Sequence, residues 1–190
     1  ELPNEFKEGE VRFFRQHQDG FVALRLRLPL GFISCSDFRL IADVAEKYSE
    51  ERGLITIRSQ DLLLRFIKEE QVSEVAKALS ALSVDVLAPG ALDHFVACAG
   101  ASTCLLGLGL ARGAAKATAE ALDKENRDIE GLKINISGCP NACGQHPAAP
   151  VGFFGATMRE GKRLVPAYRL VLGAKSDEGG ARLSEPIGMI

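Results

Sequence analysis

One stretch constrains this 190-residue chain more than any other: Ile136-Ser-Gly-Cys-Pro-Asn-Ala-Cys-Gly-Gln-His146. It follows a mostly apolar segment, 132–136, that is typical of a strand, and the Gly, Pro and Asn around its two cysteines predict a loop. An earlier pair, Cys98 and Cys104, has a similar setting of small residues. Four thiolates from two loops can close around one centre that needs soft ligands.

The spacing of the four cysteines favours an iron–sulfur cluster over the other uses of cysteine. The pairs are Cys98-x5-Cys104 and Cys139-x3-Cys143. Zinc sites favour short spacings, which x3 satisfies and x5 exceeds. Ferredoxin clusters usually place three cysteines close together, a run that this chain lacks. A structural zinc site stays open as the alternative, whereas Cys35, alone at a helix start, is expected to be a small buried side chain.

Composition narrows the class of protein further. The chain is 46% hydrophobic, enough for a core, and its formal net charge of −2 argues against a nucleic-acid partner. It shows neither a signal peptide nor a membrane-spanning apolar run, so we expect a reducing, cytoplasmic setting. The start at Glu1 without Met and the end at Ile190 lead us to expect a fragment of a longer polypeptide.

The first part of the chain, 1–87, predicts a ferredoxin-like β-α-β-β-α-β half-domain. Residues 1–20 look irregular. The next nine alternate as in a strand, with Val22, Leu24, Leu26 and Leu28 on one face. A helix capped by Ser36 or Asp37 should run to Tyr48, burying Phe38, Ile41, Ala42 and Ala45. The remaining predicted elements are strands 54–57 and 62–67, a helix over 69–82 and a strand over 84–87.

The second part, 88–190, predicts a separate α+β domain that contains both cysteine pairs. Ala88-Pro-Gly90 is the expected hinge between the two parts. A helix is expected to start just after Cys104 and to run to about Asp123. Its glycines weaken that prediction and permit close approach of the backbone to something bulky. Strands are expected at 132–136, 151–154 and 168–172, with a turn near 159–162.

The chain resembles the repeat of sirohaem-dependent nitrite and sulfite reductases along nearly all its length. The cysteine loops carry the specific part of this resemblance. Moderate support comes from the other matching segments, which are Gly20-Phe-Val-Ala-Leu-Arg-Leu-Arg-Leu-Pro-Leu-Gly31, Gly53-Leu-Ile-Thr-Ile-Arg-Ser-Gln-Asp-Leu-Leu-Leu64, Val151-Gly-Phe-Phe-Gly155 and Tyr168-Arg-Leu-Val-Leu-Gly173.

The resemblance implies a 4Fe-4S domain whose [4Fe–4S] cluster is coupled to sirohaem. Family enzymes use this pair for electron transfer in the six-electron reduction of nitrite to ammonia or of sulfite to sulfide. The implied cluster ligands are Cys98, Cys104, Cys139 and Cys143. Cys143 would also bind the sirohaem iron, and Asn141 and Thr103 occupy positions that contact sirohaem in the family.

Sirohaem is a polyanion and needs cationic partners. Arg25, Arg27, Arg58 and Arg65 are candidates, and Arg58, beside Ser59-Gln60, is the preferred one. The alternative for each is a solvent-facing strand arginine. His146 is expected either to tune the cluster sulfurs or to be a structural contact of its loop.

Family enzymes carry two repeats, and most substrate-facing Lys and Arg residues belong to the repeat without the cysteines. The catalytic residues are therefore unknown here, and Lys133 alone makes no anion clamp. The expected partners are a second repeat or a homodimer mate, the anion nitrite or sulfite, and an electron donor such as ferredoxin or a reductase flavoprotein. The alternative function is a non-catalytic metal-binding or assembly half-domain, held by zinc or metal-free and inactive without a second repeat.

Overall fold

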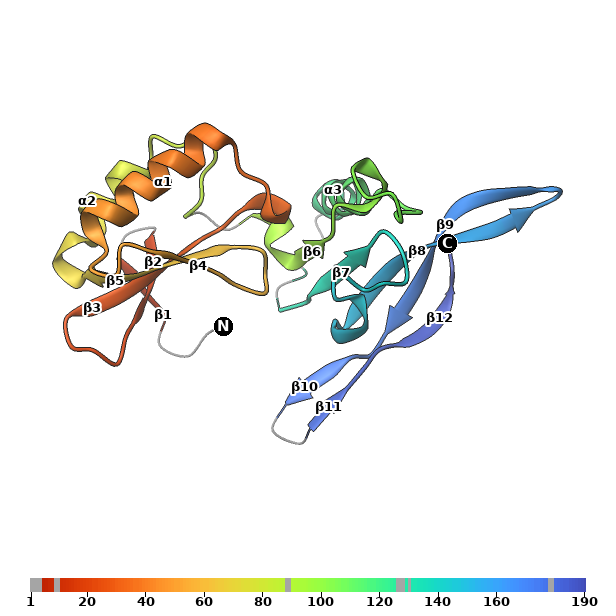
Figure 1. Ribbon diagram of the computed structural model, residues 1–190. Coiled ribbons are helices and arrows are strands. Elements are labelled where there is room, and N and C mark those ends of the chain that lie inside the picture. The colour runs from red at the N-terminus through yellow and green to blue at the C-terminus, as the bar shows by residue number, and fades with distance from the viewer. Residues whose placement is uncertain (1–4, 9–10, 88–89, 126–128, 130, 178–179) are drawn as a thin grey trace. The chain divides into compact units, whose positions relative to one another are not determined.

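The computed structural model describes residues 5–8, 11–87, 90–125, 129, 131–177 and 180–190 of the chain. It divides into two compact units, Glu1–Gly90 and Ala91–Ile190 (Figure 1). The predicted α+β class with a ferredoxin-like half-domain is confirmed. Among the described residues, no helix is long and apolar enough to cross a membrane.

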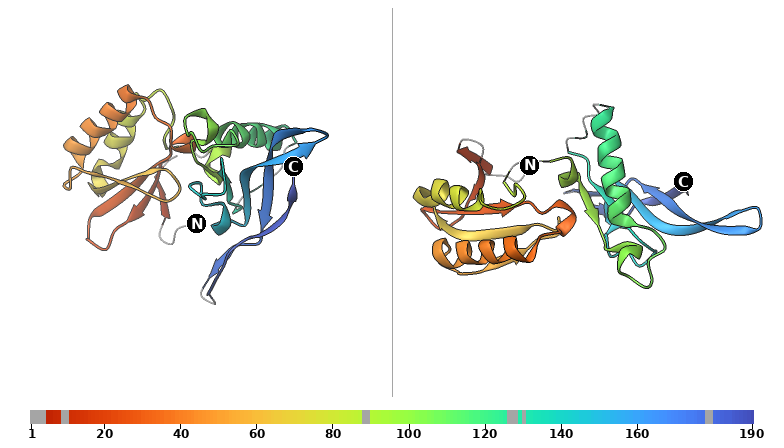
Figure 2. Two further views of the ribbon diagram at one scale, coloured as in Figure 1. Left: turned by 45° about the vertical axis from the view of Figure 1, so that its right-hand side comes forward. Right: turned by 90° about the horizontal axis from the view of Figure 1, so that it is seen from above.

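The first unit is an antiparallel sheet with two helices on one face. Helices α1 (Cys35–Tyr48) and α2 (Val72–Leu79) lie side by side across this sheet (Figures 1 and 2). The strand order is β1-β2-β3-β5-β4. The strands are β1 (Glu5–Glu8), β2 (Val11–Arg15), β3 (Phe21–Leu26), β4 (Leu54–Thr56) and β5 (Leu62–Lys68).

The core of this unit forms from the predicted face of β3. All four predicted residues are buried, and they cluster with apolar side chains of α1, β5 and α2; the set includes Val22, Leu24, Leu26, Leu28, Ile41, Leu64, Ile67 and Val75. Helix α1 is turned relative to the prediction. Its N-cap is Ser34, whose Oγ accepts a hydrogen bond from the Asp37 N–H at 3.1 Å. Val44 is buried, whereas Phe38 and Ala42 of the predicted inward face are exposed.

Three local predictions for the first unit are wrong. Residues 1–20 contain strands β1 and β2, which extend the sheet as a hairpin. Residues 84–87 form no strand: the Val86 carbonyl accepts one bond from Arg27 N–H, and the Asp85 carboxylate accepts the Leu87 N–H at 2.9 Å. Such a local side-chain bond competes with a sheet ladder. Cys35 is exposed at the first position of α1 and is not buried.

The second unit is a five-stranded mixed sheet of order β12-β9-β8-β7-β6, beside which lies helix α3 (Ala111–Lys124). Strands β6, β7 and β8 are parallel, and β8, β9 and β12 are antiparallel. A separate two-stranded ribbon pairs β10 with β11. The strands are β6 (Phe95–Ala97), β7 (Ile134–Ser137), β8 (Val151–Glu160), β9 (Arg163–Leu172), β10 (Lys175–Asp177), β11 (Gly180–Arg182) and β12 (Glu185–Met189).

Helix α3 begins seven residues after Cys104, at Ala111, and not directly after the thiol. The intervening backbone makes bonds that a helix would forbid, because the N–H groups of Leu108 and Gly109 both donate to Gly138. The predicted turn after β8 is confirmed at Gly161, whose φ is +60°. Strands β8 and β9 extend beyond their predicted bounds up to this turn.

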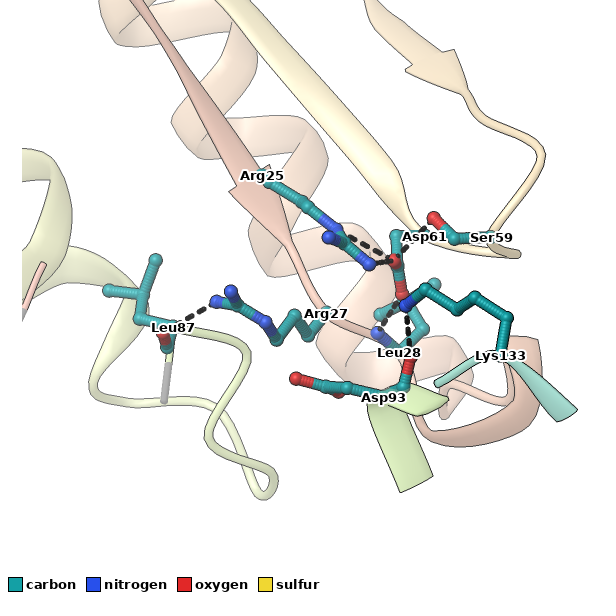
Figure 3. Close-up of polar contacts among 8 residues, drawn as sticks. All are labelled: Arg25, Arg27, Leu28, Ser59, Asp61, Leu87, Asp93 and Lys133. Atoms are coloured by element: carbon teal, nitrogen blue, oxygen red, sulfur yellow. Dashed lines mark hydrogen bonds and ion pairs between the residues drawn. The ribbon is translucent and has the colours of Figure 1, made fainter. Parts of the chain in front are cut away.

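One buried carboxylate organises the end of strand β3 (Figure 3). Arg25 donates to Asp61 Oδ2 through Nε at 2.9 Å and through Nη2 at 2.6 Å. The Ser59 hydroxyl donates to the same oxygen at 2.7 Å, and the Leu28 N–H donates to Oδ1 at 3.0 Å. Only 5% of the Asp61 side chain is exposed, so its charge depends on these donors.

We predict that Asp61→Ala destabilises the first unit by about 3 kcal/mol, because it leaves the Arg25 charge and the Leu28 N–H without their partner. Urea unfolding should measure this loss. Glu51→Ala is the matched control: it breaks the more exposed Arg65–Glu51 pair, of 2.7 Å, and should cost far less. Equal losses in the two variants would contradict the assignment.

Candidate functional site

The two cysteine loops begin at the carboxyl ends of neighbouring parallel strands. Cys98 directly follows β6, and Cys139 comes two residues after β7, while Ala97 pairs with Ile136 between the strands. The Cys98 N–H extends the ladder by donating to the Ile136 carbonyl at 3.1 Å. Parallel strands bring their carboxyl ends to one sheet edge, so the sheet itself brings the two loops together.

Gly138 joins the loops through both of its backbone groups. Its N–H donates to the Cys98 sulfur at 3.0 Å. Its carbonyl accepts the Leu108 N–H at 2.7 Å and the Gly109 N–H at 2.9 Å. These bonds tie the end of the first loop, at Leu108 and Gly109, to the start of the second loop at Gly138. The Cys98 thiol accepts an N–H···S bond of the kind that tunes cluster sulfurs.

Several glycines let these backbones approach more closely than any side chain would permit. A Cβ on Gly138 would lie 2.5 Å from the Gly100 Cα, and one on Gly155 would lie 2.1 Å from the Gly138 oxygen. A Cβ on Gly109 would lie 2.6 Å from the hydroxyl oxygen of Tyr168. The glycine backbones therefore do approach other groups closely, and those groups are other parts of the same protein.

Ser137 shapes the second loop from the end of β7. Its buried Oγ accepts the Gly144 N–H at 3.1 Å and lies 2.9 Å from His146 Nδ1. Asn135, two residues earlier, donates through Nδ2 to the Gln145 carbonyl at 3.1 Å. Gln145 adopts a left-handed backbone, with φ of 57°, and this bond helps to hold it there.

His146 is a structural contact of this loop. It is buried, and it stacks on Phe154 with ring centroids 4.6 Å apart and an interplanar angle of 30°. Its hydrogen bond goes to Ser137. Burial lowers the pKa of His146 below its ordinary value of 6.5, so the folded state favours the neutral imidazole.

The four predicted cluster ligands are free thiols. Cys98 and Cys139 are half-buried, whereas Cys104 and Cys143 are exposed. Asn141 and Thr103, on the same two loops, are exposed as well. Among the described residues, no three His, Cys, Asp or Glu side chains are grouped so that they could hold a metal ion.

Most of the candidate cations have partners within their own unit. Arg25 is bound to Asp61, and Arg65 pairs with Glu51 at 2.7 Å. Arg27 is buried and donates to the Leu87 carbonyl at 3.0 Å (Figure 3). Arg58 is exposed in the turn between β4 and β5.

Lys133, in the second unit, donates to the Asp93 carbonyl at 3.1 Å (Figure 3). This contact engages its ammonium group with the backbone of its own unit.

Sequence reasoning missed Ser137, Asp61 and Tyr168. The position of Ser137, directly before Gly138, was a usable signal, because a hydroxyl at the end of a buried strand can bond the loop that follows. Asp61 and Tyr168 gave no such signal, since their partners come from distant parts of the chain.

Comparison with known proteins finds a matching family and several relatives of this chain. Residues 14–82 match the family described as Nitrite/Sulfite reductase ferredoxin-like half domain. The "Ferredoxin--nitrite reductase" of Synechococcus elongatus is 29% identical over 161 residues, which cover 84% of this chain and 31% of that protein. Residues 14–82 thus carry the likeness to the nitrite/sulfite reductase ferredoxin-like half-domain. Another relative, "Sulfite reductase [ferredoxin] 2" of Mycolicibacterium paratuberculosis, is 25% identical over 87% of this chain and 31% of its own length.

Two solved structures share the fold. The Mycobacterium tuberculosis NirA protein superposes with a TM-score of 0.76 at 22% identity, over 98% of this chain and 35% of that one. Dissimilatory sulfite reductase I reaches 0.67 at 13% identity, over 88% of this chain and 57% of that one. The chain spans about a third of the length of the two curated relatives from Synechococcus elongatus and Mycolicibacterium paratuberculosis.

We predict that Gly155→Ala destabilises the second unit by about 1–3 kcal/mol or more, because its Cβ would lie 2.1 Å from the Gly138 oxygen and would push the loops apart. Denaturant unfolding checks this. Gly188→Ala is the matched control, since a Cβ there meets nothing within 4 Å. If Gly155→Ala were as stable as Gly188→Ala, the close packing would not be required.

We predict that the stability of the second unit falls as the pH drops below about 6.5. His146 has a lowered pKa in the folded state, so between that pKa and the ordinary value of 6.5 the unfolded chain binds more protons and gains in population. Unfolding free energies measured from pH 8 to pH 5 should show the loss. His146→Gln should remove this pH dependence and exposed His17→Gln should not; the reverse pattern would refute it.

Proposed function

We propose that this chain is the cysteine-bearing part of a nitrite or sulfite reductase and binds a [4Fe–4S] cluster coupled to sirohaem. The observation that carries the proposal is the junction at Gly138, which joins both cysteine loops and donates an N–H to the Cys98 sulfur at 3.0 Å. Cys98, Cys104, Cys139 and Cys143 are the proposed ligands, with Cys143 shared with sirohaem.

The donor set supports an iron–sulfur cluster. Four free thiols lie on two loops at one sheet edge, and Cys104 and Cys143 are open to an incoming group. A zinc ion would need its sulfurs crowded at about 2.3 Å around one point. A [4Fe–4S] cluster distributes its four thiolates over four irons, so its ligands stand further apart.

The chain's own residues would bind and orient the cofactors. When bound, the coupled pair supplies the electrons that reduce nitrite to ammonia or sulfite to sulfide. Exposed Asn141 and Thr103 are the proposed polar contacts to the macrocycle from the two loops. Exposed Arg58 is the proposed cation for its carboxylates, a role that suits a guanidinium.

The enzyme would need more than this chain. The chain covers 31% of each of the two reductases compared above, and the substrate-gripping cations are proposed to lie in a second repeat or in a homodimer mate. Relatives named for ferredoxin support ferredoxin as the electron donor. Nitrite and sulfite are both retained as substrates, because relatives carry both names.

We predict that anaerobic reconstitution loads the chain with iron and labile sulfide and that Cys143→Ser lowers the iron content severalfold, because one of four ligands is lost. Iron and sulfide analysis with visible absorbance measures this. Cys35→Ser is the matched control, since Cys35 is exposed on α1, outside both loops, and it should load like the wild type.

The same samples discriminate the alternative. Zinc without iron, or equal loading of the two serine variants, would refute the cluster and favour a zinc-held or metal-free assembly half-domain. Mass in solution then separates a monomer from a dimer.

A further inference from the structure

The Tyr168 hydroxyl is buried and has no hydrogen-bond partner among the described residues. A buried phenol normally finds a partner, because an unmatched polar atom costs stability. Such an orphan in a folded protein calls for an explanation, and a group that binds nearby is one of them. The proposed cluster ligands lie in the same unit.

The strand register directs the Tyr168 side chain toward the cysteine loops. Tyr168 on β9 lies directly opposite Gly155 on β8, and directly opposed residues project from the same face of a sheet. A Cβ on Gly155 would point into the Gly138 carbonyl, at 2.1 Å. The Tyr168 ring therefore lies on the face of the sheet that carries the Gly138 junction.

Contacts of the ring place it against the same junction. A Cβ on Gly109 would lie 2.6 Å from both Cζ and the hydroxyl oxygen of Tyr168, so the ring packs on the Gly109 backbone. Gly109 donates to the Gly138 carbonyl at 2.9 Å, and the Gly138 N–H donates to the Cys98 sulfur. Gly109 thus contacts both the Tyr168 ring and Gly138, the residue whose N–H donates to the Cys98 sulfur.

The backbone of Tyr168 is fixed on its other side as well. Its N–H donates to the Ile190 carbonyl at 2.8 Å, and its carbonyl accepts the Ile190 N–H at 2.9 Å. A phenol keeps its proton near neutral pH, so the hydroxyl can act as a donor.

We propose that Tyr168 is a positioning residue of the cluster, whose hydroxyl donates a hydrogen bond to the Cys98 thiolate when that thiolate binds iron. This inference rests on the proposed function. A ligated thiolate carries charge and has acceptor capacity beyond the bond from the Gly138 N–H. A second donor stabilises the more negative, reduced cluster and so raises its reduction potential.

Tyr168→Phe tests the inference, because it removes the hydroxyl alone. The reconstituted variant should hold as much iron as the wild type, but its potential should be more negative. At a fixed applied potential the ratio of reduced to oxidised cluster should fall about tenfold, which is about 59 mV for one electron. Tyr48→Phe, at the chain's other tyrosine, on α1 of the first unit, is the matched control and should leave the potential unchanged.

A second measurement, on cofactor-free protein, separates this role from a structural one. There Tyr168→Phe should unfold at the same temperature as the wild type or at a higher one, since it removes an unpaired buried hydroxyl. A lower midpoint, or a loaded variant with the wild-type potential, would overturn the tyrosine's role alone. A wild-type chain that takes up neither iron nor labile sulfide would overturn the proposed function and, with it, this inference.

Discussion

The close approach of three backbone segments at Gly138 is the constraint on which the second unit depends. The Gly100, Gly138 and Gly155 backbones lie so near that a Cβ on Gly138 or Gly155 would fall within 2.5 Å of a neighbouring backbone atom. This proximity lets one residue bond a sulfur with its N–H and two loop amides with its carbonyl. Helix α3 starts at Ala111 for the same reason, because the amides of Leu108 and Gly109 are already committed to Gly138.

The parallel strands β6, β7 and β8 supply the geometry that this junction needs. They bring the starts of both cysteine loops to one edge, and the buried polar residues Asn135 and Ser137 on β7 then bond the second loop from within. Buried polar side chains are costly unless they are satisfied, and here their partners are loop atoms. The hydrogen bonds that satisfy β7 are therefore the ones that shape the loop carrying Cys139 and Cys143.

Sequence patterns correctly predicted the structural features that depend on residues close together in the chain. The alternation from Val22 to Leu28 specified the core face of β3, and the glycine near residue 161 specified the β8–β9 turn. Patterns failed where a distant partner decides the outcome. The segment 84–87 has strand-forming residues, yet the Asp85 carboxylate accepts the Leu87 N–H. Arg25 and Arg27 were predicted either to bind sirohaem or to face solvent, but they donate to Asp61 and to the Leu87 carbonyl. The cysteine spacing predicted which residues form the proposed site, but it carried no information on Gly138 or Tyr168, whose contacts arise only when strands and loops pack.

Two buried polar groups, Asp61 in the first unit and Tyr168 in the second, differ in how they are satisfied. In the first, Asp61 receives donors from Arg25, Ser59 and Leu28, so its charge is matched within the protein. In the second, the described residues leave four free thiols on two tightly packed loops and a buried Tyr168 hydroxyl with no hydrogen-bond partner. An unmatched polar atom lowers stability, and we infer that one kept in the same unit as the proposed cluster ligands awaits a group that completes its hydrogen bonds. The Asp61 carboxylate is thus matched within its own unit, whereas the Tyr168 hydroxyl keeps its bonding capacity for the group that we propose the second unit binds.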